Sequence, residues 1–238
     1  MDPGTGDPVW RSDAKALPIG VVAALDLEGR IAAPAIRPGS ETLHVSGPGA
    51  DRAFAAAKRA IAGGARGLVS FGLAGGLTPA AAPASVLLPE SGSGRDYRWS
   101  ADRGWHGRLR QALEADFALV ENPLYSADRV LTTVREKSEA ATSSGAAAVD
   151  MESASIARAA EESELPFVVL RVVVDGSGDA LPASVASLVT DDGRTRYSGL
   201  AGFVLAPNQL PLLFRLAGRS GKARQTLRRV VATLMRQG

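Results

Sequence analysis

The stretch LPFVVLRVVVD at residues 165–175 decides most of what the sequence indicates about the fold. Residues 165–174 are apolar except for Arg171, and a continuous apolar run rich in valine predicts a strand that is buried on both faces. The run ends at Asp175, where a loop rich in Gly, Ser, Asp and Pro follows over residues 176–182. A strand of this kind implies a sheet that is covered on both sides.

Shorter apolar runs before this strand alternate with helical patterns. The predicted strands are 17–25, 43–46, 66–71, 85–88, 118–125 (one strand or two) and 146–149. The predicted helices are 50–62, 105–115, 136–144 and 152–164. Residues 72–77 and 95–103 are expected to be loops. This alternation predicts the α/β class, with helices on both faces of a central sheet.

The chain of 238 residues is expected to hold one domain over residues 17–238. Residues 1–16 are polar and are expected to form a flexible leader, because they lack the apolar core of a secretory signal. Residues 183–238 are expected to form a helical extension, with a long helix over 209–235 that is interrupted near residues 218–221. No run reaches the ~18–20 apolar residues of a membrane span, so a cytoplasmic location is expected.

Composition excludes several kinds of chemistry. The absence of cysteine excludes disulfides, thiol nucleophiles and thiolate metal sites, and the two histidines His44 and His106 are too few for a multi-histidine metal centre. The segment GLAGGL at residues 72–77 lacks the G-x-G-x-x-G spacing of dinucleotide sites, and Ser70 does not lie in a G-x-S-x-G motif. We therefore expect no metal and no bound cofactor.

Charge is distributed unevenly along the chain. The formal charge is −7 through Asp192 and +9 beyond it. This asymmetry predicts either a surface for an anionic partner, or a solvated helix face that pairs with the acidic body or with another subunit.

Carboxylates and glycines follow the predicted strands, where ligands bind in open α/β sheets. A partly desolvated carboxyl group can have its pKa raised toward neutrality and donate a proton, and carboxylates around a sugar stabilise an oxocarbenium-like transition state. The pattern therefore fits glycosyl transfer or glycoside hydrolysis. Taken singly, these residues are also typical of helix caps, turns and solvated loops. The set comprises Asp26, Glu28, Asp150, Glu152, Asp175 and the glycine segments at residues 46–49 and 72–76.

Five motifs in this order resemble the nucleoside phosphorylase/nucleosidase superfamily. They are IGVVAALDLE (19–28), VSGPG (45–49), VSFGLAGGL (69–77), AVDMESASIA (148–157) and the strand at 165–175. The superfamily includes purine nucleoside phosphorylases and methylthioadenosine/S-adenosylhomocysteine nucleosidases. The resemblance covers about residues 17–180 and implies a three-layer sandwich around a mixed sheet, and a homo-oligomer.

The resemblance also implies roles for individual residues. Asp175 would be the general acid that protonates purine N7, and Glu28 would activate water. Glu152 would hold the ribose hydroxyls, with Arg171 steadying the acidic site from the strand. The other implied substrate-binding residues are Met151, Ala74, Gly75 and Val130, and the implied phosphate-binding residues are Ser46, Gly47 and Gly72.

Within the superfamily, the chain most resembles the hopanoid-associated phosphorylases of bacteria. The motifs are ALDLEGRIA (24–32), GLAGGL (72–77), DALP (179–182) and APNQLPLLFRLAGRSGKARQTLRR (206–229). The resemblance implies phosphorolysis of adenosylhopane with inorganic phosphate as co-substrate, which releases adenine, and no nucleic-acid partner. The basic tail would then contact the inner face of the membrane through anionic headgroups, with Leu210, Leu212, Leu213, Phe214 and Leu216 supplying apolar contact. Burial of these apolar side chains against the core is the alternative.

Two other functions stay open. Leu73 occupies a position where many members of the superfamily have a serine that contacts phosphate or ribose, which together with Glu28 favours a hydrolytic nucleosidase of the methylthioadenosine type. Val130 lies where a base-stacking aromatic side chain is expected, and Tyr97 is a candidate to replace it. A catalytically silent protein that binds a nucleoside or a lipid is the third candidate.

Overall fold

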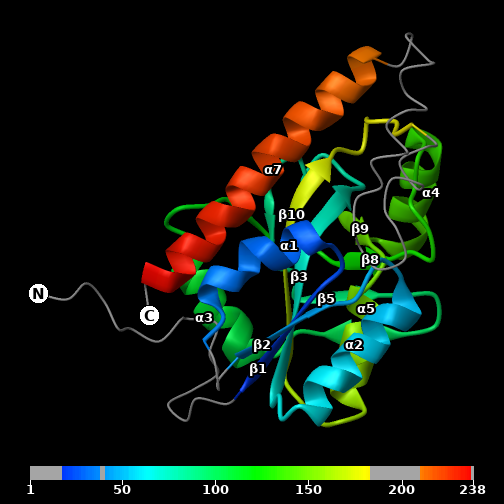
Figure 1. Ribbon diagram of the computed structural model, residues 1–238. Helices are drawn as coiled ribbons and strands as arrows, with labels where there is room; N and C mark the ends of the chain where they lie inside the picture. Colours follow the sequence, from blue (N-terminus) through cyan, green and yellow to red (C-terminus); the bar gives the residue numbers. More distant parts are fainter. Residues whose placement is uncertain (1–17, 38–40, 183–209, 237–238) are drawn as a thin grey trace, which may run out of the picture.

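The computed structural model describes residues 18–37, 41–182 and 210–236 (Figure 1). Ten strands form one mixed sheet with helices on both faces, as predicted. The strands are β1 (Ile19–Ala23), β2 (Glu41–Val45), β3 (Gly67–Gly76), β4 (Val86–Leu87), β5 (Ser91–Ser93), β6 (Arg98–Ser100), β7 (Leu119–Val120), β8 (Leu124–Ser126), β9 (Ala148–Asp150) and β10 (Phe167–Asp175). The helices are α1 (Asp26–Ala32), η1 (Ala33–Ala35), α2 (Ala50–Ala62), α3 (Arg103–Leu113), α4 (Val134–Ser144), α5 (Ser153–Glu161) and α7 (Leu210–Arg236).

Strands β3 and β10 form the centre of the sheet. The strand order is β6-β5-β8-β9-β3-β10-β4-β7, and β1 joins β3 and β2 off this path. β1, β2, β3 and β10 run parallel, whereas β9 is antiparallel to β3 and β4 is antiparallel to β10. The two central strands are almost entirely buried, which explains why both are continuous apolar runs.

Helices cover the two faces of the sheet in separate groups (Figure 1). α1, α3 and α7 lie together, with α7 against β10, whereas α2 packs on α5 and both contact the sheet. Alanine lines the buried face of α2 at Ala53, Ala56, Ala57 and Ala60, which lets the helix approach the sheet closely. At Gly20 in β1, an added Cβ would lie 2.7 Å from the Cβ of Ala60, so a side chain there would separate the two layers.

One edge of β3 is shared by two partners. Residues 67–71 pair with β1, and Gly75 and Gly76 pair with β9. Between these two pairings, the edge of β3 at residues 72–74 has no partner among the strands that the structure describes. This gap lies at the carboxyl end of β1, where the candidate site is found.

The structure corrects three sequence predictions. Residues 72–76 continue β3 rather than forming a loop, because β10 and β9 supply hydrogen-bond partners on its two edges. The expected loop at 95–103 contains β6 in a hairpin with β5. Helix α1, after β1, was not among the predicted elements. α7 is a single helix through residues 218–221.

The continuity of α7 has a physical reason. Gly218 and Gly221 have no neighbour within 4 Å of an added Cβ, so neither glycine is needed for a close approach. The helix is instead held by a buried apolar stripe of Ala223, Leu227, Val230, Val231 and Leu234. The predicted leader at 1–16 and the helical pattern that begins near residue 183 lie outside the described residues.

Candidate functional site

A cavity of about 410 Å3 lies at the carboxyl ends of β1, β3 and β10. Its walls are mainly apolar, and its volume falls in the roughly 300–1,000 Å3 range of small-molecule sites. Polar and charged groups enter it at defined points, and they include Glu28, Glu152, Arg171 and Asp175. The cavity thus brings together the four residues to which the sequence analysis gave chemical or orienting roles.

Glu28 fills the gap along the edge of β3. Its Oε1 accepts a hydrogen bond from the backbone N–H of Leu73 at 2.8 Å, and its Oε2 accepts from Ala24 and Leu25 at 3.0 and 2.9 Å. Gly72 has φ +151°, and a Cβ there would lie 2.5 Å from the Glu28 carboxyl group. Only glycine at position 72 therefore leaves room for this carboxyl group.

Arg171 is the centre of a buried polar network beneath the cavity. Its Nε lies 2.9 Å from Asp150 Oδ2, and its Nη2 lies 3.3 Å from Glu152 Oε2. The guanidinium also donates to the Leu73 carbonyl oxygen at 2.8 Å and to Ser70 Oγ at 2.9 Å. One strand residue thereby ties together β3, the carboxyl end of β9 and the start of α5.

Asp150 belongs to this network rather than to the helix cap alone. It accepts hydrogen bonds from Ser126 Oγ at 2.6 Å and from the Ser153 backbone N–H at 3.1 Å, and it also contacts Ser153 Oγ. Asp150 therefore does two things: it accepts a hydrogen bond from the backbone at the start of α5, and it forms an ion pair with Arg171.

The network contains more acidic groups than cations. Burial raises the pKa of Glu152 to about 7 against the lowering effect of Arg171, and the nearby carboxylates of Asp150 and Glu28 raise it further. Burial also raises the pKa of Glu28, although Arg171 and three backbone N–H groups oppose the rise. Glu152 Oε1 accepts from the Gly49 N–H at 3.0 Å, which ties the glycine turn before α2 to the site.

Asp175 meets a lysine that the sequence analysis did not single out. Lys137 on α4 lines the same cavity, is buried, and donates to Asp175 Oδ2. From the sequence, burial is the expected reason for Asp175 to keep a proton. An ammonium group in contact with the carboxyl group instead stabilises the carboxylate form.

The remaining predicted site residues fall into two groups. Met151, Ala74, Gly75 and Val130 line the cavity, whereas the three predicted phosphate-binding residues are absent from its lining. Ser46 Oγ instead lies 2.6 Å from the Gly47 carbonyl oxygen and 3.3 Å from that of Ala23. Pro48 is the residue of the VSGPG turn that borders the cavity.

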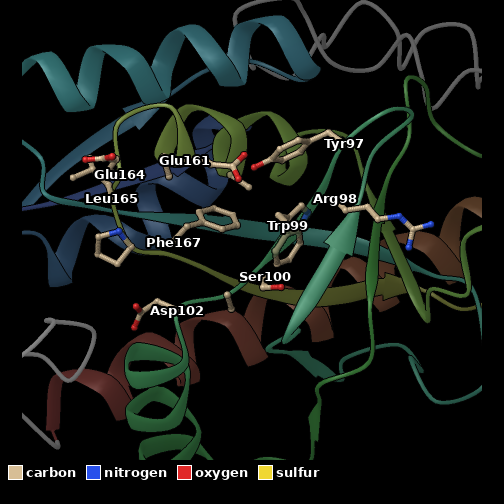
Figure 2. A pocket seen from close by; sticks show the side chains of 13 residues that line it. Tyr97, Arg98, Trp99, Ser100, Asp102, Glu161, Glu164, Leu165 and Phe167 are labelled. Carbon is tan, nitrogen blue, oxygen red and sulfur yellow. The ribbon is translucent and has the colours of Figure 1, made fainter.

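A larger surface depression of about 680 Å3 lies at the opposite end of β10, around Phe167 (Figure 2). Its lining includes Tyr97, whose hydroxyl group is directed toward Glu161, and the edge-to-face pair of Trp99 and Phe167, with ring centroids 5.3 Å apart. Burial and the hydrogen bond to Glu161 raise the pKa of Tyr97. Tyr97 is absent from the lining of the cavity that holds Asp175, so the structure does not support it as a base-stacking residue there.

Among the described residues, one group of three side chains has the types and spacing to hold a metal ion, namely Glu90, His106 and Glu121. None of them lines the cavity. His106 Nε2 is already 2.8 Å from the Leu88 carbonyl oxygen, and Glu121 lies 3.6 Å from Arg110 Nε, so these groups have partners within the fold.

Sequence reasoning missed Lys137, Ser70 and Ser153. Lys137 lies in a helix whose pattern is polar, and nothing in its local sequence marks it as buried. Ser70 and Ser153, whose Oγ atoms are 2.8 Å apart, complete the set of Arg171 partners. The one available signal was Arg171 itself, because a charged residue inside an apolar strand requires buried acceptors.

Comparisons with known proteins identify the family of the chain. Residues 36–198 match the model of the phosphorylase superfamily, and the chain belongs to that superfamily. Among curated proteins, none matches the chain.

Solved structures extend the similarity to nearly the whole chain. Futalosine hydrolase of Helicobacter pylori has a TM-score of 0.71 at 15% identity, covering 95% of this chain and 100% of that one. The 5'-methylthioadenosine/S-adenosylhomocysteine nucleosidase of Neisseria meningitidis, in complex with methylthio-immucillin-A, has a TM-score of 0.71 at 17% sequence identity. The match covers 93% of this chain and 99% of that one. The corresponding nucleosidase of H. pylori has a TM-score of 0.70 at 16% sequence identity, and the match covers 94% of this chain and 99% of that one. These similarities show a shared fold.

Proposed function

We propose that the protein cleaves the N-glycosidic bond of a purine nucleoside. The observation that carries the proposal is the placement of Asp175, Glu152 and Glu28 around one cavity with largely apolar walls. Membership of the phosphorylase superfamily supports it, as do the structural neighbours that bind nucleoside analogues.

In the proposed reaction, the base lies against the apolar walls with N7 toward Asp175. The bond between C1' and N9 breaks, its electron pair moves into the base, and N7 receives a proton from the Asp175 carboxyl group. Glu152, as a carboxylate, accepts hydrogen bonds from the ribose hydroxyls and stabilises positive charge that develops on the sugar. The nucleophile adds to C1' on the other side of the sugar.

The finer proposal is phosphorolysis of adenosylhopane, with release of adenine. It is supported by the resemblance of the motifs at residues 24–32, 72–77, 179–182 and 206–229 to the hopanoid-associated phosphorylases. Exposed basic residues on α7, among them Lys222, Arg228 and Arg229, are available to anionic headgroups of the membrane that holds such a substrate. None of the described helices is apolar enough, over a sufficient length, to cross a membrane.

Hydrolysis of a methylthioadenosine-type nucleoside is the second candidate. Two observations favour it. Glu28 borders the cavity, and the residues expected to bind phosphate lie outside its lining. In that reaction Glu28 would accept a proton from the attacking water.

One assay separates these functions. Adenine release is measured with purified protein on adenosylhopane and on methylthioadenosine, each with and without inorganic phosphate. Release from adenosylhopane that requires phosphate supports the finer proposal, whereas phosphate-independent release from methylthioadenosine supports hydrolysis. If neither substrate nor other purine nucleosides release base, N-glycosidic cleavage is wrong.

A vesicle assay tests the membrane contact. Binding to vesicles that contain anionic lipid is expected to fall when Arg228 and Arg229 are replaced by Gln, and to weaken as salt is raised. Equal binding to neutral vesicles would contradict the proposal, and activity on a soluble nucleoside serves as the control for folding.

A further inference from the structure

Lys137 is a fully buried lysine on the lining of the cavity. Its side chain is 1% exposed, although lysine is almost never fully buried unless it is paired. Its Nζ donates to Asp175 Oδ2, to the Gly176 carbonyl oxygen at 2.8 Å and to the Asp179 carbonyl oxygen at 2.9 Å. All three ammonium hydrogens therefore have an acceptor.

The fold holds this lysine firmly in place. Lys137 follows a capping box in which Thr133 Oγ1 accepts from the Glu136 N–H at 3.1 Å, and Glu136 Oε2 accepts from the Thr133 N–H at 2.9 Å. On the other side, the loop after β10 is fixed by the bond between the Gly176 N–H and Asp179 Oδ2 at 2.8 Å. Both ends of the Lys137–Asp175 contact are thus set by local hydrogen bonds.

A buried ion pair is a poor device for stability, because desolvation of the two charges offsets much of their attraction. Its placement on the lining of the cavity suggests a chemical role instead, since both partners border the space where a base would lie. The Lys137 ammonium group also holds a proton in direct contact with the Asp175 carboxyl group. Lysine can release a proton to a carboxylate, whereas arginine cannot.

We infer that Lys137 is a positioning residue that supplies the proton which Asp175 passes to the leaving base; this inference rests on the proposed function. One N–H bond of the Lys137 ammonium breaks and an O–H bond forms on Asp175. That O–H bond then breaks as the N7–H bond of the base forms and the electron pair of the C1'–N9 bond moves into the base. Lys137 is left as a neutral amine and Asp175 as a carboxylate, and a proton from water restores the ammonium after the products leave.

Other charged groups surround the pair and set its electrostatic environment. α4 carries Arg135, Glu136 and Glu139, the loop after β10 carries Asp179, and the cavity lining adds Glu28, Asp128, Arg129, Asp150, Glu152 and Arg171. The variants that test the inference change Lys137 and none of these other groups. A shift in the pH dependence of kcat/KM is therefore assigned to the Lys137–Asp175 pair.

The test compares Lys137→Arg and Lys137→Met with wild type. With the nucleoside that the wild type cleaves, both variants are expected to lower kcat about 10- to 100-fold at pH 7, because the relay donor is lost. In Lys137→Met the alkaline limb of the kcat/KM profile is expected to move down by at least about one pH unit, because Asp175 then holds its proton alone. Lys58→Met, which removes a surface lysine 3.5 Å from Glu162, is the matched control and should leave both quantities unchanged.

A second substrate separates proton supply from folding. With 4-nitrophenyl β-D-ribofuranoside, whose leaving group departs without protonation, both variants are expected to stay within about threefold of wild type. Equal losses on both substrates, or a Lys137→Arg variant with wild-type kcat and pH profile, would overturn the relay while leaving nucleoside cleavage intact. A wild-type protein that cleaves no purine nucleoside would overturn the proposed function, and the relay with it.

Discussion

Two buried cations contact the acidic groups of the site: Arg171 is part of β10, and Lys137 reaches Asp175 at the end of β10 from α4. Arg171 contacts two carboxylates, Asp150 and Glu152, and also acts electrostatically on Glu28. Lys137 contacts one carboxylate and two backbone carbonyl oxygens. Arg171 thus pairs with more than one carboxylate through a guanidinium group that does not lose its proton, whereas Lys137 forms a one-to-one pair with Asp175, in which we infer that the proton moves. The comparison separates the part of the site that holds its shape from the part to which the proposed proton transfer is assigned.

The largest effect is expected at the reactive pair. Asp175→Asn keeps an oxygen that can accept from Lys137 but cannot pass a proton to the base, so kcat/KM should fall by about 10²–10⁴-fold. Steady-state kinetics measure the loss, and Glu162→Gln on the surface is the control. Wild-type activity in Asp175→Asn would mean that the acid lies elsewhere in the cavity.

The organising cation should matter most for stability. Arg171→Met leaves Asp150 and Glu152 buried without their cation, which should lower the free energy of unfolding by about 3–5 kcal/mol. Chemical denaturation measures this change. Arg158→Met, which removes a surface ion pair with Glu162 at 3.0 Å, should cost less than about 1 kcal/mol. If Arg171→Met and Arg158→Met lowered the free energy of unfolding by similar amounts, the buried Arg171 ion pairs would be no more important for stability than a surface ion pair.

A substitution at Gly72 tests whether the position of the Glu28 carboxyl group is fixed by the close approach of the β3 backbone. Gly72→Ala places a methyl group 2.5 Å from the Glu28 carboxyl carbon at a φ of +151°, so the free energy of unfolding should fall by about 2–4 kcal/mol. Activity should fall as well, because Glu28 must move. Gly107→Ala in α3, where an added Cβ meets nothing within 4 Å, is the control and should be neutral or slightly stabilising. A stable and active Gly72→Ala variant would show that the Glu28 position is not needed.

The smallest expected effect is the pH dependence of stability that arises from the buried carboxyl group of Glu152. The pKa of Glu152 rises from an ordinary 4.5 to about 7 on folding, so the folded protein binds more protons than the unfolded chain between these pH values. The contribution of Glu152 to stability is therefore present in acid and lost as pH rises through about 7, by about 1–3 kcal/mol. Unfolding measured at pH 5 and pH 8 checks this, and Glu152→Gln should reduce the difference. An unchanged difference in that variant would assign the pH dependence to other groups.

Much of the fold could be predicted from sequence because its strongest signals are local. The apolar runs at β1, β3 and β10 and the alanine pattern of α2 need no tertiary information. The extension of β3 through residues 72–76 could not be predicted, because glycine there is tolerated only where β9 and β10 supply partners from elsewhere in the chain. The continuity of α7 likewise depends on tertiary burial of its apolar stripe.

The candidate site shows the same limit. Glu28 and Asp175 could be predicted as site residues because they lie just after or at the carboxyl ends of β1 and β10, which are parallel strands whose ends gather at one edge of the sheet. Glu152 follows β9, which is antiparallel to β3, so this rule does not explain how Glu152 reaches the same cavity. Lys137 comes from a helix, and its distance to Asp175 depends on how α4 packs. Proximity of this kind is set by tertiary structure and leaves no trace in the local pattern.

The carboxyl group of Glu28 also completes the sheet. It takes the hydrogen bond of Leu73 at the point where β3 passes from one partner strand to the other. Any substitution of Glu28 that tests its proposed chemical role will therefore also disturb the junction of two strand pairings. A replacement at position 28 therefore has to supply an acceptor for the Leu73 N–H as well as any new chemical group.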